Sequence, residues 1–122
     1  MRPPSERLTL QESGAVEVFV GKLLAEFGPD VTDVRLFGSK ARGEAGSDSD
    51  VDILVLVQRS DYSLKHAILQ MAADASLTYD VLLSPRVVPL TAWQEMILAD
   101  TLFYRTVLAE SIPLKPQPRV PA

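Results

Sequence analysis

Apolar residues recur at helical spacing in three stretches of this chain, so the sequence predicts three helical regions. The first starts at a capping-box pair, Thr9 and Glu12, and stops at Gly28-Pro29, where glycine and proline end the apolar run. The second covers residues 64–75 and is expected to be capped at Ser60 or Asp61. The third opens at another candidate capping box, Thr91 and Gln94, and continues to residue 108, with Asp100-Thr101 as a candidate interruption.

Three short apolar runs between these helices have the composition of β-strands: residues 34–37, 51–57 and 77–83. Residues 51–57 are apolar on both faces except at Asp52, which is typical of a central strand covered on at least one side. The third run is expected to stop at Ser84-Pro85. This order of elements predicts an α/β (α+β) fold in which helices pack against a small mixed sheet.

Length and composition are those of one small domain. The chain has 122 residues, of which 47% are hydrophobic and 23% charged, and a single core suits that length. We expect residues 1–114 to form the domain and the proline-rich residues 115–122 to be a disordered tail. No run approaches the ~20 apolar residues of a membrane span, and no secretory signal is evident at the N-terminus, which predicts a cytoplasmic protein.

The absence of cysteine and the presence of a single histidine restrict the chemistry of any metal site. Thiolate and histidine-rich sites are excluded, so a bound metal would need oxygen ligands, as magnesium does. The formal net charge of −4 argues against binding an extended nucleic acid, which requires many cationic contacts to phosphates. A small anionic substrate in a local pocket is compatible with this charge.

Two carboxylates stand at the start of the apolar strand. Asp50 and Asp52 are two residues apart, so in a strand their side chains project from one face. At a separation of roughly 6.5 Å and an effective dielectric constant of ~20, two such charges repel by about 2.5 kcal/mol. A divalent cation would turn this repulsion into chelation. The alternative is that both are exposed at a strand end, without a function.

Asp80 is the candidate third carboxylate, because it lies within the apolar run of residues 77–83. If that run is a strand beside residues 51–57, Asp80 completes a cluster able to hold two magnesium ions and to accept a proton from an attacking hydroxyl. Asp48 continues the alternation, but a calcium loop starting there is rejected, because its sixth and twelfth positions are Ile53 and Arg59. Asp48 is interpreted as a solvated loop residue.

Gly38-Ser39 follows the strand at residues 34–37 and has the features of a phosphate-binding turn. Glycine allows close approach of the backbone, and the serine hydroxyl and free amides can bind phosphate oxygens. Arg42 or Lys40 could add positive charge. The alternative is an ordinary strand-ending turn, in which glycine and serine are common.

The stretch GSKARGEAGSDSDVDILV at residues 38–55 resembles the signature of the DNA polymerase β-like nucleotidyltransferases, in which Gly-Ser, Ala-Arg-Gly and Ser-Asp-x-Asp recur in that order. Within that superfamily the short chain is similar to the minimal nucleotidyltransferases, many of which are antitoxins paired with a HEPN-domain toxin. Two positions depart from the family pattern: Ile53 replaces a common leucine, and Ser111 stands where glycine is frequent.

The resemblance implies a palm-like fold, a site and a reaction. Gly38 and Ser39 would bind the nucleotide, beside Arg42 as the candidate cation, and Asp50, Asp52 and Asp80 would bind two magnesium ions, with Asp80 as the expected base. ATP would donate AMP to a hydroxyl, with a tyrosine of the HEPN toxin as the expected acceptor. Two rival functions remain open: transfer to a small molecule such as an antibiotic, and neutralisation of a partner by binding alone.

Overall fold

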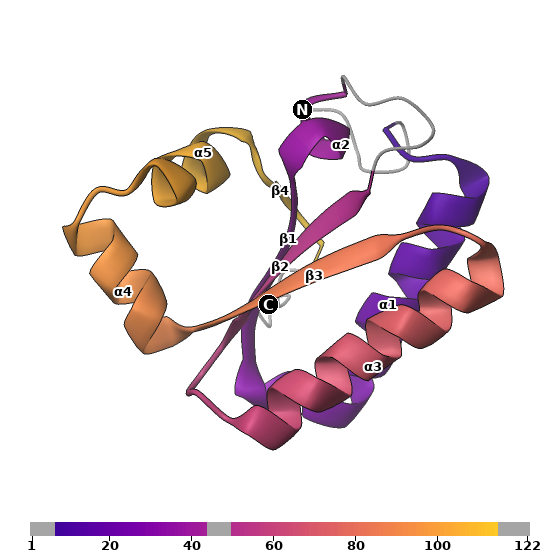
Figure 1. The fold of residues 1–122 in the computed structure, drawn as a ribbon, viewed down its shortest axis with the longest axis horizontal. Helices are drawn as coiled ribbons and strands as arrows, with labels where there is room; N and C mark the ends of the chain where they lie inside the picture. The colour runs from indigo at the N-terminus through magenta and orange to yellow at the C-terminus, as the bar shows by residue number, and fades with distance from the viewer. Residues whose placement is uncertain (1–6, 44–49, 115–122) are drawn as a thin grey trace, which may run out of the picture.

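A four-stranded mixed sheet with strand order β3-β2-β1-β4 forms the centre of the structure (Figure 1). The computed structural model describes residues 7–43 and 50–114. β1 is antiparallel to both β2 and β4, whereas β2 and β3 are parallel. The elements are α1 (Leu10–Phe27), the 3-10 helix η2 (Gly28–Asp30), β1 (Val31–Phe37), α2 (Gly38–Arg42), β2 (Val51–Val57), α3 (Tyr62–Tyr79), β3 (Leu83–Pro89), α4 (Leu90–Leu98), α5 (Leu102–Glu110) and β4 (Ile112–Pro113).

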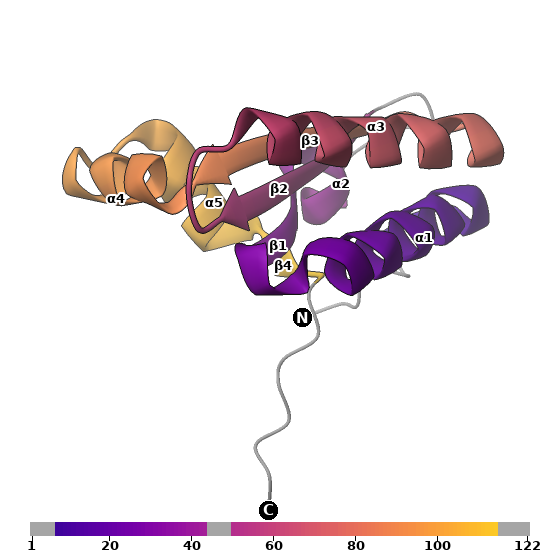
Figure 2. The ribbon, with the colours of Figure 1, turned by 90° about the horizontal axis from the view of Figure 1, so that it is seen from below.

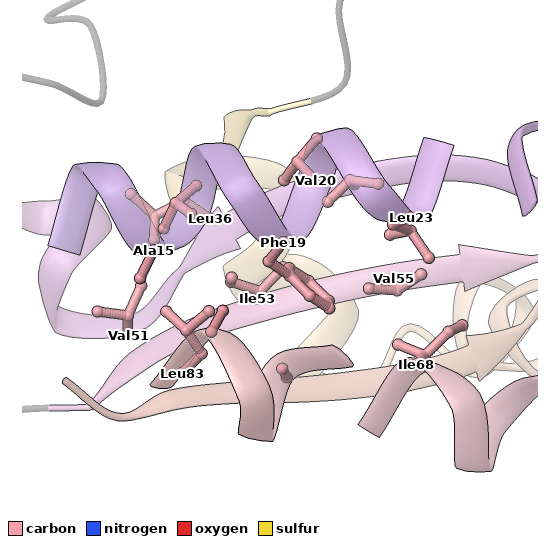
Figure 3. Close-up of a cluster of buried hydrophobic side chains, with 14 of the residues drawn as sticks. Ala15, Phe19, Val20, Leu23, Leu36, Val51, Ile53, Val55, Ile68 and Leu83 are labelled. Atoms are coloured by element: carbon pink, nitrogen blue, oxygen red, sulfur yellow. The ribbon is translucent and has the colours of Figure 1, made fainter. Parts of the chain in front are cut away.

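The central strand β2 divides its side chains between two apolar clusters. Val51, Ile53 and Val55 face α1 and α3, where they surround Phe19 of α1 (Figure 3). Leu54 points to the opposite face, where a smaller cluster is covered by α4 and α5. Figure 2 shows α1 and α3 along one side of the sheet and α4 and α5 beyond its other face. This arrangement confirms the predicted fold class.

Several sequence predictions are confirmed residue by residue. Thr9 and Glu12 form both halves of the capping box at the start of α1. β2 has the predicted bounds and lies inside the sheet between β1 and β3. Asp61 caps α3, because its Oδ1 accepts a 3.1 Å hydrogen bond from the amide of Leu64. The predicted break between two helices also occurs, with Thr101 as the N-cap of α5.

The predicted strand at residues 77–83 is wrong. α3 continues to Tyr79, whose ring packs so closely on Gly14 of α1 that a Cβ at Gly14 would lie 2.6 Å from its Cε1 atom. Asp80 then ends the helix with φ at 54°, a left-handed conformation that aspartate tolerates better than most residues. The real strand, β3, contains Pro85, because an edge strand can accommodate a missing N–H.

Two further corrections concern the C-terminal half. The expected capping box at Thr91 and Gln94 is absent, because α4 starts at Leu90 after Pro89 and has no side-chain cap. The short strand β4 was not predicted. Ser111, the departure from the family pattern, has φ at −73°, which does not require glycine, and its hydroxyl accepts a 2.6 Å hydrogen bond from Nε of Arg35.

Among the described residues, no helix is both long enough and apolar enough to span a membrane. Asp48 and the expected tail at residues 115–122 lie outside the described ranges.

A buried ion pair joins α1 to α2. Nζ of Lys40 lies 2.8 Å from Oε2 of Glu12, and both side chains are about 95% removed from solvent, with 4% and 5% exposed. The other oxygen of Glu12 accepts a 2.9 Å hydrogen bond from the amide of Thr9 in the capping box. One carboxylate therefore fixes the start of α1 and the position of α2, the short helix that follows β1.

Replacing Lys40 with methionine should lower the free energy of unfolding by about 3–5 kcal/mol, because it leaves the Glu12 carboxylate buried without its cation. The double variant Glu12→Gln with Lys40→Met should recover much of that loss, since glutamine can keep the capping bond while no buried charge remains. Denaturant unfolding of the three proteins measures this. Equal loss in the single and double variants would contradict a dominant charge effect.

Candidate active site

The end of β1 and the start of β2 bring Gly38 and Asp52 into direct contact. Phe37, the last residue of β1, is the register partner of Asp52, and Gly38 follows it with φ at 75°. A Cβ atom at Gly38 would overlap Oδ2 of Asp52 and would lie 3.2 Å from its Cγ. Glycine is therefore required twice here, once by backbone conformation and once by the closeness of the carboxylate.

Asp50 and Asp52 lie together at this edge of the sheet, as the sequence predicts. Asp50 is exposed just before β2, and Asp52 is half-buried at its second residue. Burial raises the pKa of Asp52 above its ordinary value of 3.8, the negative charge of Asp50 raises the pKa further, and Arg42 partly offsets both effects. The raised pKa means that ionised Asp52 is held in the fold at a cost that a bound cation would reduce.

Asp80 is not brought to this pair. It was expected on a strand beside β2, but it is exposed at the C-terminus of α3, before β3 begins. In register, Asp52 faces Ser84 of β3 instead. Across residues 7–43 and 50–114, no three acidic or histidine side chains come close enough to hold a metal ion together. The predicted three-carboxylate cluster is therefore wrong for the described residues, and two carboxylates remain.

The residues around the Gly-Ser turn divide between structural and site positions. Lys40 forms a buried ion pair with Glu12, so it holds α2 against α1. Ser39 is half-buried beside Gly38 at the start of α2. Arg42 is exposed at the end of α2, where its charge acts on Asp52, and its Nη1 lies 3.1 Å from Oε2 of Glu110. Of the two cations considered from the sequence, Arg42 is the one placed at the site.

Arg86 lies on the same sheet face as Asp52, a feature that sequence reasoning missed. Leu54 is the register partner of Arg86 and shares the Asp52 face, and the Arg86 guanidinium carbon is 4.1 Å from the centroid of the Phe103 ring of α5. The sequence signal for this residue was a single arginine between Pro85 and two valines. It was missed because the predicted strand ended at Ser84-Pro85, so this segment was not expected to be in the sheet.

The donor set fits a hard divalent cation. Two carboxylates without histidine or cysteine are what the described residues offer, and magnesium commonly binds one or two protein carboxylates while substrate phosphates and water complete its octahedron. The Gly38 amide region and Ser39 lie beside Asp52, where the phosphates of a nucleotide would need to be. This is the arrangement that binding of a nucleotide together with a divalent cation would require.

Comparison with known proteins identifies the family of this chain. The nucleotidyltransferase domain family matches residues 17–108. A protein of Methanocaldococcus jannaschii named "Putative protein adenylyltransferase MJ0141" is 37% identical over an alignment of 73 residues, and the match covers 52% of this chain and 74% of that protein. The chain therefore belongs to the nucleotidyltransferase domain family, and it is a nucleotidyltransferase.

Solved structures share the fold. A crystal structure of a toxin–antitoxin with AMP-PNP superposes with a TM-score of 0.54 at 23% identity, covering 84% of this chain and 74% of that one. A crystal structure of a mutant of the toxin–antitoxin MntA-HpeT gives a TM-score of 0.52 at 21% identity, covering 81% and 72%. At these identities the likeness concerns the fold alone.

Changing Gly38 to alanine should lower the free energy of unfolding by about 1–3 kcal/mol, because the new side chain is strained at positive φ. It should also displace the Asp52 carboxylate and so reduce nucleotidyl transfer by more than the stability loss accounts for. Gly21→Ala is the matched control, since nothing lies within 4 Å of a Cβ added in the middle of α1. Full transfer activity in a folded Gly38→Ala protein would contradict the proposed contact.

Changing Asp52 to asparagine should stabilise the metal-free protein at neutral pH. A pKa raised by folding means that the stability contributed by Asp52 is present below the ordinary pKa of 3.8 and is lost as pH rises through the folded value. The gain from asparagine should therefore shrink as pH falls toward 3.8. Thermal unfolding across this pH range, with Asp74→Asn on the exposed side of α3 as control, measures it; a neutral-pH destabilisation would refute it.

Proposed function

We propose that this nucleotidyltransferase transfers AMP from ATP to a hydroxyl group on a partner protein, in the manner of an antitoxin that modifies its toxin. The observation that carries the proposal is the contact between Asp52 and Gly38, with Asp50 at the same strand end. This contact supports the proposal, because two carboxylates lie beside the candidate phosphate-binding turn, an arrangement that a binding module would have no reason to assemble.

Each residue has a defined task in this proposal. Gly38 lets the backbone approach the phosphates, while Ser39 and Arg42 bind and orient the polyphosphate. Asp50 and Asp52 would hold magnesium, which when bound would supply Lewis-acid stabilisation of the charge that develops on the phosphate oxygens. The position of α2, and with it the phosphate turn, is fixed by the buried pair of Lys40 and Glu12.

The reaction is an in-line displacement. The acceptor oxygen forms a bond to the α-phosphorus, the bond from that phosphorus to the bridging β-phosphate oxygen breaks, pyrophosphate leaves with the bonding electron pair, and the hydroxyl proton passes to water. Positioning and electrostatics supply most of the rate enhancement in such reactions. The two carboxylates close to the phosphate turn suit that role.

Three findings support a protein acceptor in a toxin–antitoxin pair. The relative from Methanocaldococcus jannaschii carries the name of a protein adenylyltransferase, and structures of toxin–antitoxin complexes share the fold. The described residues form a single sheet with its covering helices, and they contain no second domain that would present an acceptor. We therefore propose that the acceptor arrives on a separate protein, with a tyrosine of a HEPN toxin as the expected target.

Incubating the protein with magnesium, ATP and the protein encoded next to it should add AMP to that protein, as intact-mass and peptide mass spectrometry would show. Asp50→Ala and Asp52→Ala should each lower the rate by at least about a hundredfold, a common size for loss of a charge-stabilising group. EDTA should abolish transfer. Asp74→Asn, an exposed substitution on α3, should leave the rate unchanged.

The same assay separates the rival functions. Survival of toxin neutralisation in both alanine variants would favour stoichiometric binding, and AMP transfer to an aminoglycoside or another small hydroxyl compound without the protein would favour the small-molecule enzyme. Asp80→Asn decides whether the third carboxylate has a role, because its exposed position at the end of α3 predicts a rate close to that of the unmodified protein.

A further inference from the structure

Arg86 is a cation on the same face of the sheet as Asp52, and the proposed nucleotide site does not use it. Its side chain is exposed, its guanidinium carbon lies 4.1 Å from the Phe103 ring centroid, and no carboxylate pairs with it within residues 7–43 and 50–114. Phe103 is itself held in place by edge-to-face contacts with Phe37 at 5.5 Å and Trp93 at 6.3 Å. The guanidinium is therefore presented on a rigid aromatic support with its hydrogen-bond donors open to a ligand.

The sheet topology places Arg86 and the phosphate turn on opposite sides of Asp52. β2 lies between β1 and β3, and all three meet at one edge, because Asp52 is in register with both Phe37 and Ser84. Gly38 and Ser39 follow β1, whereas Arg86 is two residues beyond Ser84 on β3. Strand spacings put the Cα atoms of Asp52 and Arg86 about 8 Å apart, on the same face.

The geometry of in-line displacement requires the two substrates to approach Asp52 from different sides. The attacking oxygen and the leaving pyrophosphate must lie on opposite sides of the α-phosphorus. If the polyphosphate lies on the β1 side, at Gly38 and Ser39, the acceptor must enter from the β3 side, where Arg86 is. We propose, on the basis of the proposed transferase function, that Arg86 is an acceptor-binding residue that recognises an anionic group beside the acceptor hydroxyl.

The chemistry of the site defines the acceptor group. An exposed guanidinium binds carboxylate or phosphate oxygens through paired hydrogen bonds, and its aromatic support limits its rotamer freedom before binding. The acceptor therefore carries an acidic side chain or a phosphate close to the hydroxyl that is modified. A neutral small hydroxyl compound has no such group and would not use Arg86.

The test is steady-state kinetics with the protein encoded next to this one as acceptor, varying acceptor and ATP separately. Arg86→Gln should raise the acceptor KM by about 10- to 100-fold, the usual cost of losing a charged hydrogen bond. The KM for ATP, and the Kd of a non-hydrolysable ATP analogue with magnesium, should change less than about twofold, because Arg86 lies away from the phosphate turn. Arg86→Lys should be intermediate, since lysine keeps the charge but not the planar fork.

Two comparisons make the result specific. Ser39→Ala should show the reverse pattern, a weaker ATP analogue with an unchanged acceptor KM. Arg59→Gln removes the same charge from an exposed position beyond the other end of β2 and should change neither parameter. Phosphatase treatment of the acceptor and amide substitution of its acidic residues then distinguish a phosphate from a carboxylate as the group recognised.

Each outcome is decisive for Arg86. A raised KM for ATP with an unchanged acceptor KM, or no change in either parameter while the circular dichroism spectrum stays native, would overturn the inference. Failure of the transferase proposal itself gives a different result, namely no transfer by the unmodified protein. If Arg86→Gln does not fold, the lysine variant carries the same test.

Discussion

The contact between the Asp52 carboxylate and the backbone of Gly38 is the constraint on which this site depends. It requires a left-handed glycine at the end of β1 and a half-buried charge on a strand whose other residues are buried. Neither is stable in isolation, so the surrounding structure must hold them. The register between β1 and β2 brings Asp52 next to Gly38. The buried ion pair of Lys40 and Glu12 fixes the position of α2, which begins at this glycine.

Stability and chemistry oppose each other at this edge of the sheet. Burial and the neighbouring charge of Asp50 raise the pKa of Asp52, so the ionised pair weakens the fold at neutral pH when no cation is bound. The apolar cluster on the other face of β2 offsets this loss of stability, because Val51, Ile53 and Val55 are fully buried there against α1 and α3. Active sites commonly place such unfavourable charges on a rigid support.

In the proposed mechanism, the two substrates contact different strands of the same sheet. The candidate phosphate turn follows β1, Asp50 and Asp52 lie at the start of β2, and Arg86 belongs to β3, where Phe103 of α5 contacts its guanidinium. In this proposal, three adjacent strands about 4.8 Å apart present sites for the polyphosphate, the α-phosphate and the acceptor in that order. If the proposal holds, nucleotide recognition and acceptor recognition are divided between neighbouring strands of this one sheet.

Local sequence patterns determined the helix starts at Thr9 and Asp61, the bounds of β2, and the closeness of Asp50 to Asp52, because capping and strand alternation depend on residues a few positions apart. The end of α3 was decided by tertiary structure: Tyr79 packs on Gly14 of α1, a distant partner that no local pattern reveals. The same holds for Asp80, Arg86 and Ser111. Their roles follow from strand register and from contacts between segments far apart in the chain, which the sequence by itself does not specify.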